Sequence, residues 1–146
     1  MGKFNFRLQA VLEVRAKKEE AAQRALARAW REYRRLLHGL NETKRRLEEA
    51  SAPAGGVLDV TEQQHLALYR GALAERLRLQ EKAVRAAAAA VEAKRREAVR
   101  ARQERQVIEK VKEKRYGEFL REEAAAEAKI YDELTLYSFM RRRVQK

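Results

Sequence analysis

The stretch Ser51-Ala52-Pro53-Ala54-Gly55-Gly56 interrupts a chain that otherwise favours helix, and it decides the fold. Pro53 has no backbone N–H to donate inside a helix, and the paired glycines permit a chain reversal. Asp59 and Glu62 then have the spacing of a helix N-cap residue and its partner three positions on. The sequence therefore predicts a helix over about residues 4–50, a turn over about 51–59 and a second helix over about 60–141.

The composition is typical of long helices and excludes a β-rich fold. Alanine, arginine, glutamate, leucine, lysine and glutamine dominate the 146 residues, with one proline, six glycines and 38% charged residues. Leucine, valine, isoleucine and phenylalanine are too few to fill a large globular core. We therefore expect an all-α, extended architecture, with a single coiled-coil domain over residues 1–146.

Alternating steps of four and three define an apolar stripe in the first predicted helix. Nine of its twelve positions are apolar. A repeat sustained over about six heptads is the spacing of a coiled-coil seam, because it keeps one stripe facing a partner helix. The positions are Leu8, Leu12, Arg15, Glu19, Ala22, Leu26, Ala29, Tyr33, Leu36, Leu40, Thr43 and Leu47.

The second predicted helix has a matching but weaker stripe. Its apolar members include three small alanines, which bury less surface than leucine does. Because the turn is short, the two helices should run antiparallel. The apolar positions are Leu66, Leu73, Leu77, Val84, Ala87, Val91, Ala98, Ala101 and Ile108, interrupted by Arg70, Gln80, Lys94 and Arg105.

The register of this hairpin predicts a long overhang of the second helix. If Ala50 pairs with Asp59 or Val60, then Leu8 faces Arg102, and Glu19 lies beside Val91 and Lys94. Residues 107–141 would then extend unpaired for about 50 Å, at 1.5 Å per residue. A lone helix cannot bury the apolar side chains of this segment, so a partner should cover them. They are Ile108, Val111, Tyr116, Phe119, Leu120, Ile130, Leu134, Tyr137 and Phe139.

No pattern in the sequence indicates catalysis, a cofactor or a metal site. The chain has no cysteine, and its two histidines, His38 and His65, lie in different helices without neighbouring ligands. Neither Ser51 nor Ser138 has the context of a nucleophile, and no glycine-rich phosphate loop occurs. We expect a non-enzymatic protein.

The chain also lacks membrane-targeting features. No run approaches the roughly 20 apolar residues that a spanning helix needs, and Met1 to Ala10 lack the apolar core of a signal peptide. The absence of cysteine fits a reducing compartment. We expect a cytoplasmic protein that does not insert into the membrane.

A formal charge of +12 would suit an acidic partner. Residues 94–121 hold eleven basic and five acidic side chains, which leaves a basic helical nucleic-acid-binding protein as an alternative. The acids are interleaved with the bases, whereas a phosphate-tracking face would exclude them, so we expect no nucleic-acid partner. A second alternative is a structural coiled coil that homodimerises through the overhang.

Two segments resemble the FliJ family of flagellar proteins. The N-terminal segment reads Phe4-x-Phe6-x-Leu8-Gln9-x-Val11-Leu12-x-x-Arg15, followed by Glu19, Ala22 and Leu26. The C-terminal segment reads Glu109-Lys110-Val111-Lys112-Glu113-Lys114-Arg115-Tyr116, followed by Phe119-Leu120, Glu122-Glu123 and Asp132-Glu133-Leu134. The two segments resemble that family's opening and closing signatures and flank a central turn. The related virulence-secretion stalk proteins stay an alternative.

The resemblance implies a cytoplasmic component of the flagellar type III export apparatus, peripheral at the cytoplasmic face of the inner membrane. Such proteins resemble the central stalk of rotary ATPases, and they are described as general chaperones. The implied partners are the hexameric export ATPase and the cytoplasmic domain of the export gate, with export chaperones as further partners. No cofactor is implied.

The resemblance also implies two partner-binding regions. The positions that match the family's gate-contacting pattern, early in the second helix, are Leu66, Tyr69, Leu73 and Leu77. By analogy with a rotary stalk, contact with the ATPase is expected from Arg115, Tyr116, Phe119 and Arg121.

Overall fold

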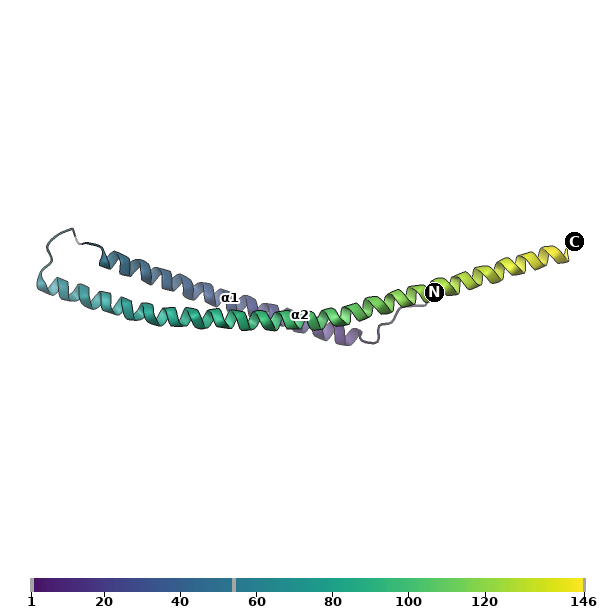
Figure 1. Ribbon diagram of the computed structural model, residues 1–146, viewed down its shortest axis with the longest axis horizontal. Coiled ribbons are helices and arrows are strands. Elements are labelled where there is room, and N and C mark those ends of the chain that lie inside the picture. The colour runs from purple at the N-terminus through teal and green to yellow at the C-terminus, as the bar shows by residue number, and fades with distance from the viewer. Residues whose placement is uncertain (1, 54, 146) are drawn as a thin grey trace. The chain divides into compact units, whose positions relative to one another are not determined.

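Two helices make up nearly all of the computed structural model, which describes residues 2–53 and 55–145 (Figure 1). Helix α1 covers Gln9–Ser51 and has 43 residues, and helix α2 covers Val60–Val144 and has 85 residues. The predicted all-α hairpin with a longer second helix is confirmed. Helix α1 begins at Gln9, about five residues later than expected, and α2 extends three residues beyond the expected end.

The segment between the helices follows the sequence signals closely. Helix α1 ends at Ser51, two residues before Pro53, as expected because proline cannot continue the helix. Neither Gly55 nor Gly56 has a positive φ angle, so neither glycine adopts a left-handed backbone. Ala54, within the expected turn, lies outside the described residues. At the start of α2, the Glu62 N–H donates to Asp59 Oδ1 at 2.7 Å, while Glu62 Oε2 accepts from the Asp59 N–H at 3.2 Å. This reciprocal pair is the predicted capping box.

The predicted seam positions are the shielded positions of both helices. Eleven of the twelve positions expected in the first helix are at least half-buried, and only Leu8 is exposed. All thirteen positions expected in the second helix are shielded as well, including the four polar interruptions. The spacing of three and four therefore identified the contact stripe correctly.

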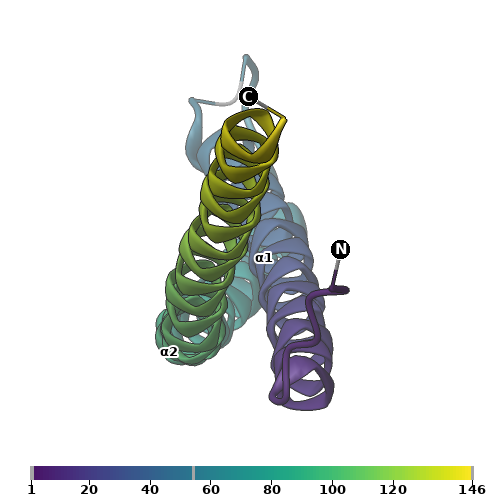
Figure 2. The same cartoon turned by 90° about the vertical axis from the view of Figure 1, so that its right-hand side faces the viewer.

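The chain divides into two compact units, one of which is residues 18–101. Within this unit α1 and α2 lie side by side and antiparallel (Figures 1 and 2). Its core contains Leu40, Leu73 and Val91, each at most 5% exposed. Arg95 also stacks over the Trp30 ring at 5.9 Å, which joins the two helices on one side.

The predicted register of the hairpin was wrong by about ten residues. The Ala50 carbonyl accepts from Arg70 Nε at 2.6 Å, whereas pairing with Asp59 or Val60 was expected. Gly39 likewise faces the Gln80 amide. The expectation paired the last residue of the first helix with the first residue of the second. In the structure, the pairing of α2 with α1 begins near Arg70, so the first turns of α2 come before the paired region. By the same offset, Glu19 lies opposite the stretch near Ala101, and not beside Val91 and Lys94.

The other unit comprises the N-terminal residues up to Lys17 and residues from Arg102 onward. Here Arg15 Nη1 donates to the Glu104 carbonyl at 2.9 Å, and Lys112 Nζ donates to Gln9 Oε1 at 2.8 Å. Leu8 and Val111 line the same groove, whereas Leu8 was expected near Arg102. The pairing continues to Gly2, whose N–H donates to Glu123 Oε1 at 2.8 Å. The prediction that α2 is unpaired from residue 107 was therefore wrong, because the N-terminal segment covers it as far as Glu123.

Candidate protein-binding surfaces

The four residues expected to contact the export gate differ in how much of each side chain is exposed. Leu73 is only 5% exposed and Leu77 is half-buried in the seam against α1. Leu66 is half-buried as well, in a groove with residues of the segment between the helices. Tyr69 is different, because 48% of its surface is accessible. Of the four, Tyr69 is the side chain that a partner could reach without separating the helices.

A shallow apolar groove lies on the same part of α2. Its walls are Gln64, Ala67, Leu68, Gly71 and Ala72. Leu68 is among the more exposed leucines of the chain. Ala67 and Gly71 form the floor of the groove beside it, because neither residue has a large side chain. Sequence analysis missed this groove, although small residues four positions apart next to an outward leucine were its visible signal.

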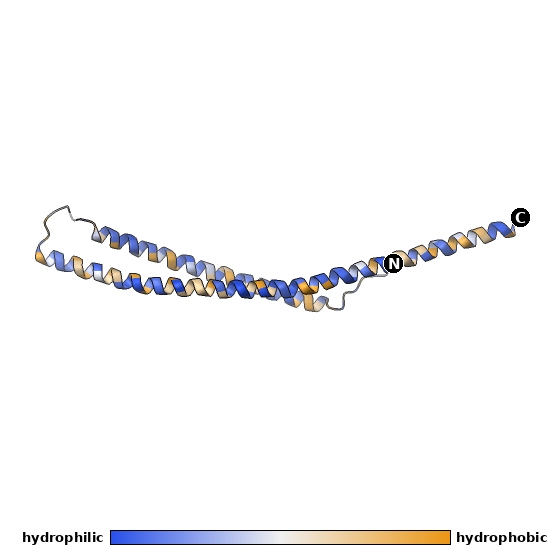
Figure 3. Ribbon diagram, viewed as in Figure 1, coloured by the Kyte–Doolittle hydropathy of each residue, from blue (hydrophilic) through white to orange (hydrophobic). Residues whose placement is uncertain are grey.

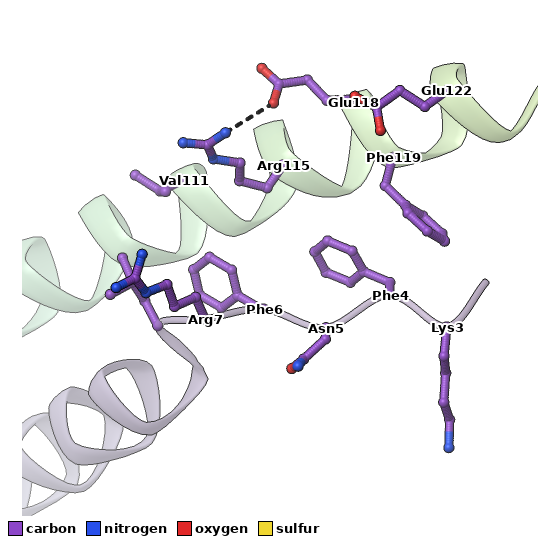
Figure 4. A pocket seen from close by; sticks show the side chains of 11 residues that line it. Lys3, Phe4, Asn5, Phe6, Arg7, Val111, Arg115, Glu118, Phe119 and Glu122 are labelled. Atoms are coloured by element: carbon purple, nitrogen blue, oxygen red, sulfur yellow. Dashed lines mark hydrogen bonds and ion pairs between the residues drawn. The ribbon is translucent and has the colours of Figure 1, made fainter. Parts of the chain in front are cut away.

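The N-terminal segment packs an aromatic cluster onto α2. Phe4 meets Tyr116 edge-on with ring centroids 5.2 Å apart. It also meets Phe119, with ring centroids 5.4 Å apart (Figure 4). Phe6 is only 8% exposed, and Lys112 Nζ lies 6.0 Å from its ring. Phe4 and Phe6 belong to an extended stretch before α1, which we call the strap and define as residues 2–8. The strap shields Phe119 and partly shields Tyr116, two of the residues expected to contact the ATPase.

The two arginines expected at the ATPase contact are accessible. The Arg115 guanidinium reaches Glu118 at 3.5 Å, and 68% of the Arg115 side chain is exposed. Arg121 is exposed as well. Arg115 borders a groove lined by strap and α2 residues (Figure 4), whereas Arg121 is not among the residues that line it. The four expected ATPase residues are therefore on one stretch of α2, with the two aromatic ones packed against the strap.

Beyond Glu123, α2 exposes an unusual number of large apolar side chains. Apolar and polar residues alternate along this end of the helix (Figure 3). Leu134 is 59% exposed and Tyr137 is 68% exposed. Arg143 stacks over the Phe139 ring at 5.9 Å. The other exposed members are Ile130, Tyr131, Leu136, Phe139, Met140 and Val144.

Two opposite stripes of this end of α2 are apolar. At 100° per residue, Ile130, Leu134 and Tyr137 lie on the side that continues the seam, and we call this the seam stripe. Leu136 and Phe139 lie on the other side, in line with Arg121, and we call this the outer stripe. A surface helix of a folded domain normally has one apolar stripe. This end of α2 therefore exposes large apolar side chains on two sides.

The charged groups with clearly shifted pKa values support the helices and mark no active site. A hydrogen bond from Arg35 lowers the pKa of the Glu32 carboxyl, and Arg45 and Arg78 do the same for Glu42 and Glu75. All three are pairs three residues apart on an exposed helix face. In the described residues, no group of three or more histidine, cysteine or acidic side chains could hold a metal ion.

Comparison with family models decides the identity of the chain. The model described as "Flagellar FliJ protein" matches residues 4–144. The chain belongs to the FliJ family. No curated protein and no solved structure gives a significant match.

Membership of the FliJ family makes the chain a component of the flagellar protein export apparatus. The match begins at Phe4 in the strap and ends at Val144, the last residue of α2. It therefore includes Tyr69, the strap from Phe4 onward and both apolar stripes. Among the described residues of this FliJ-family chain, no helix is both long enough and apolar enough to span a membrane.

Proposed function

We propose that this FliJ-family chain is a stalk-like adaptor of the export apparatus, which binds the export ATPase ring through the end of α2 and the export gate near Tyr69. The single observation that supports this most strongly is the pair of apolar stripes beyond Glu123. Exposing so much apolar surface on one helix is unfavourable in water unless another protein covers it.

The outer stripe is the proposed ATPase contact. Leu136 and Phe139 supply apolar groups that could fill pockets of a ring, and Arg121 and Arg143 on the same side supply positive charge. Apolar anchors with arginine beside them are the composition of tightly binding interface centres. Arg115 and the exposed part of Tyr116 would contribute from the neighbouring turns, whereas Phe119 would contribute only if the strap moved.

The gate contact is proposed to centre on Tyr69. An exposed tyrosine next to a shallow apolar groove offers both a ring and a hydroxyl to a partner, and tyrosine is enriched at interface centres. Leu68 and the groove floor at Gly71 complete this surface. Leu73 and Leu77 would then act indirectly, because they hold the α2 face against α1, and Leu66 would act indirectly by packing near the segment between the helices.

The remaining parts of the proposal concern the role of the chain as a whole. We infer no catalysis by this protein, a general chaperone-like role, and contacts with export chaperones. We also infer a position at the cytoplasmic face of the inner membrane, reached through the export apparatus and not through a membrane anchor. The exposed apolar groups would serve the chaperone-like role by binding unfolded or partly folded export substrates.

Two sets of variants test the two contacts separately. Arg121→Glu with Phe139→Ser should weaken binding to the export ATPase by at least about ten-fold, because it removes an apolar anchor and reverses a charge. Tyr69→Ala should weaken binding to the gate domain and leave ATPase binding intact. Arg85→Glu, at an exposed position of the other unit, is the charge-matched control. Wild-type ATPase binding by the first variant would contradict the proposed ATPase contact.

A further inference from the structure

The seam stripe is a continuation of an interface that the chain already forms. Counting in steps of three and four, the contact side of α2 runs through Lys112 and Phe119, which meet Gln9 and Phe4. It reaches Glu123, which accepts the Gly2 N–H. The same steps lead on to Glu127, Ile130, Leu134, Tyr137, Arg141 and Val144. After Glu123 the described residues of the stripe are exposed. Gly2 borders only its beginning, in a groove with Glu127 and Ile130, and the stripe continues for about six turns.

The charges along this stretch are divided between its two ends. Residues 118–129 are net acidic, with Glu118, Glu122, Glu123 and Glu127 against Arg121 and Lys129, whereas the last turn carries Arg141, Arg142 and Arg143. A helix with an acidic beginning and a basic end is complementary to a second copy of itself that runs in the opposite direction. A parallel copy would instead place like charges together, which is unfavourable.

One antiparallel register satisfies both the apolar and the charged positions. When Ile130 faces Leu134 of the second copy, Glu127 faces Tyr137 and Glu123 faces Arg141. Each pairing occurs twice because a two-fold axis relates the copies. A shift by one heptad in one direction would place Ile130 opposite Arg141. A shift in the other direction would place Glu123 opposite Leu134. Both alternatives bury a charge against an aliphatic group, which is costly.

We infer that the end of α2 self-associates as an antiparallel pair, in which the seam stripe of one copy covers that of another. Glu123 of each copy pairs with Arg141 of the other, and Ile130 packs on Leu134. The outer stripe with Leu136 and Phe139 faces away from this contact, so the pair does not use the surface proposed for the ATPase. Self-association and ATPase binding are therefore testable with different variants.

Charge exchange between two variants provides a decisive test. Glu123→Arg and Arg141→Glu each replace the two symmetric ion pairs by like-charge contacts, so each variant alone should self-associate at least about ten-fold more weakly than wild type. In a 1:1 mixture, every contact between unlike copies is again an arginine facing a glutamate. The mixture should therefore dimerise as well as wild type does. Glu123→Arg also loses the Gly2 hydrogen bond, and recovery in the mixture separates that effect from the contact between copies.

Sedimentation equilibrium of the full chain, at concentrations up to about 200 µM, measures the dissociation constant of the dimer. A dissociation constant well above this range would need higher protein concentrations to detect. Lys110→Glu is the control for Arg141→Glu, because it lowers the net charge by the same amount on the opposite side of α2. It should leave the association constant unchanged. A wild-type chain that is monomeric at every concentration would overturn the inference. So would a dimer that neither single variant weakens, or a mixture that stays monomeric.

Discussion

Phe4 of the strap packs edge-on against Tyr116 of α2, with their ring centroids 5.2 Å apart. The contact joins residues separated by more than a hundred positions in the chain, and it covers a stretch of α2 that would otherwise expose a row of aromatic rings. The strap is thus a short, extended element whose attachment depends on two phenylalanines and a few hydrogen bonds. Its dependence on Phe4 can be measured directly.

Phe4→Ala should loosen the strap. Such aromatic pairs contribute about 1 kcal/mol beyond their buried area, and Phe4 meets two rings. Limited trypsin digestion should then cut faster after Arg7, because a detached strap fits a protease site more readily. Asn5→Ala is the matched control, because Asn5 is exposed and makes none of these ring contacts. Equal cutting rates in the two variants would mean that Phe4 does not hold the strap.

The seam of the hairpin unit depends on individual buried leucines. Leu73→Ala should lower the free energy of unfolding by about 2–4 kcal/mol, because the side chain is 5% exposed and its loss leaves a cavity. Leu68→Ala, on the same helix but largely exposed, should change it by less than about 0.5 kcal/mol. Urea unfolding followed by circular dichroism measures both. Similar losses would show that the assigned faces of α2 are wrong.

A polar residue in the seam offers a stabilising substitution. Gln80 Oε1 is buried and has no hydrogen-bond partner among the described residues, and Gly39 leaves space beside it. Gln80→Met keeps the length of the side chain and removes the buried acceptor, so it should stabilise the unit by about 1 kcal/mol. Gln103→Met, at an exposed position, should have no comparable effect on the melting temperature. A lower melting temperature for Gln80→Met would indicate that the Gln80 amide is satisfied by water.

Acid should destabilise the helices through three carboxylates. Arginine partners lower the pKa values of Glu32, Glu42 and Glu75 in the folded chain. A lowered pKa contributes stability at any pH above the unfolded value, and that contribution disappears as the pH falls through the folded value. The melting temperature should therefore fall below about pH 4, where carboxylates protonate. Replacing all three by glutamine should make this fall shallower, and an unchanged pH profile would contradict the assignment.

How far the sequence predicted the structure differs from one element to the next. The seam positions and the capping box at Asp59 followed from local spacing, because helical periodicity and N-cap chemistry are set by nearby residues. The register was misjudged because the length of chain between Ala50 and its partner Arg70 depends on how α2 begins its pairing, which no local pattern encodes.

The strap was not predicted from the sequence, although its pattern was visible there. Phe4, Phe6 and Leu8 alternate with Asn5 and Arg7, and this period of two is typical of an extended segment with one apolar side. Sequence analysis instead extended the helix to about residue 4. As a result, Tyr116 and Phe119 were expected on an uncovered helix, whereas they pack against Phe4. Tyr69 and Arg121, by contrast, are exposed as a partner contact requires.

The stalk-like role is tested most directly by co-sedimentation of the purified chain with a flagellar export ATPase, with the hydrolysis rate followed in parallel. The matched comparison is a chain that ends after Glu123, because this keeps the contacts of Tyr116 and Phe119 with Phe4 of the strap and removes the exposed end of α2. We expect the intact chain to sediment with the ATPase and raise its hydrolysis rate, and the shortened chain to do neither. An intact chain that neither binds nor stimulates the ATPase, or a shortened chain that binds equally well, would contradict the account.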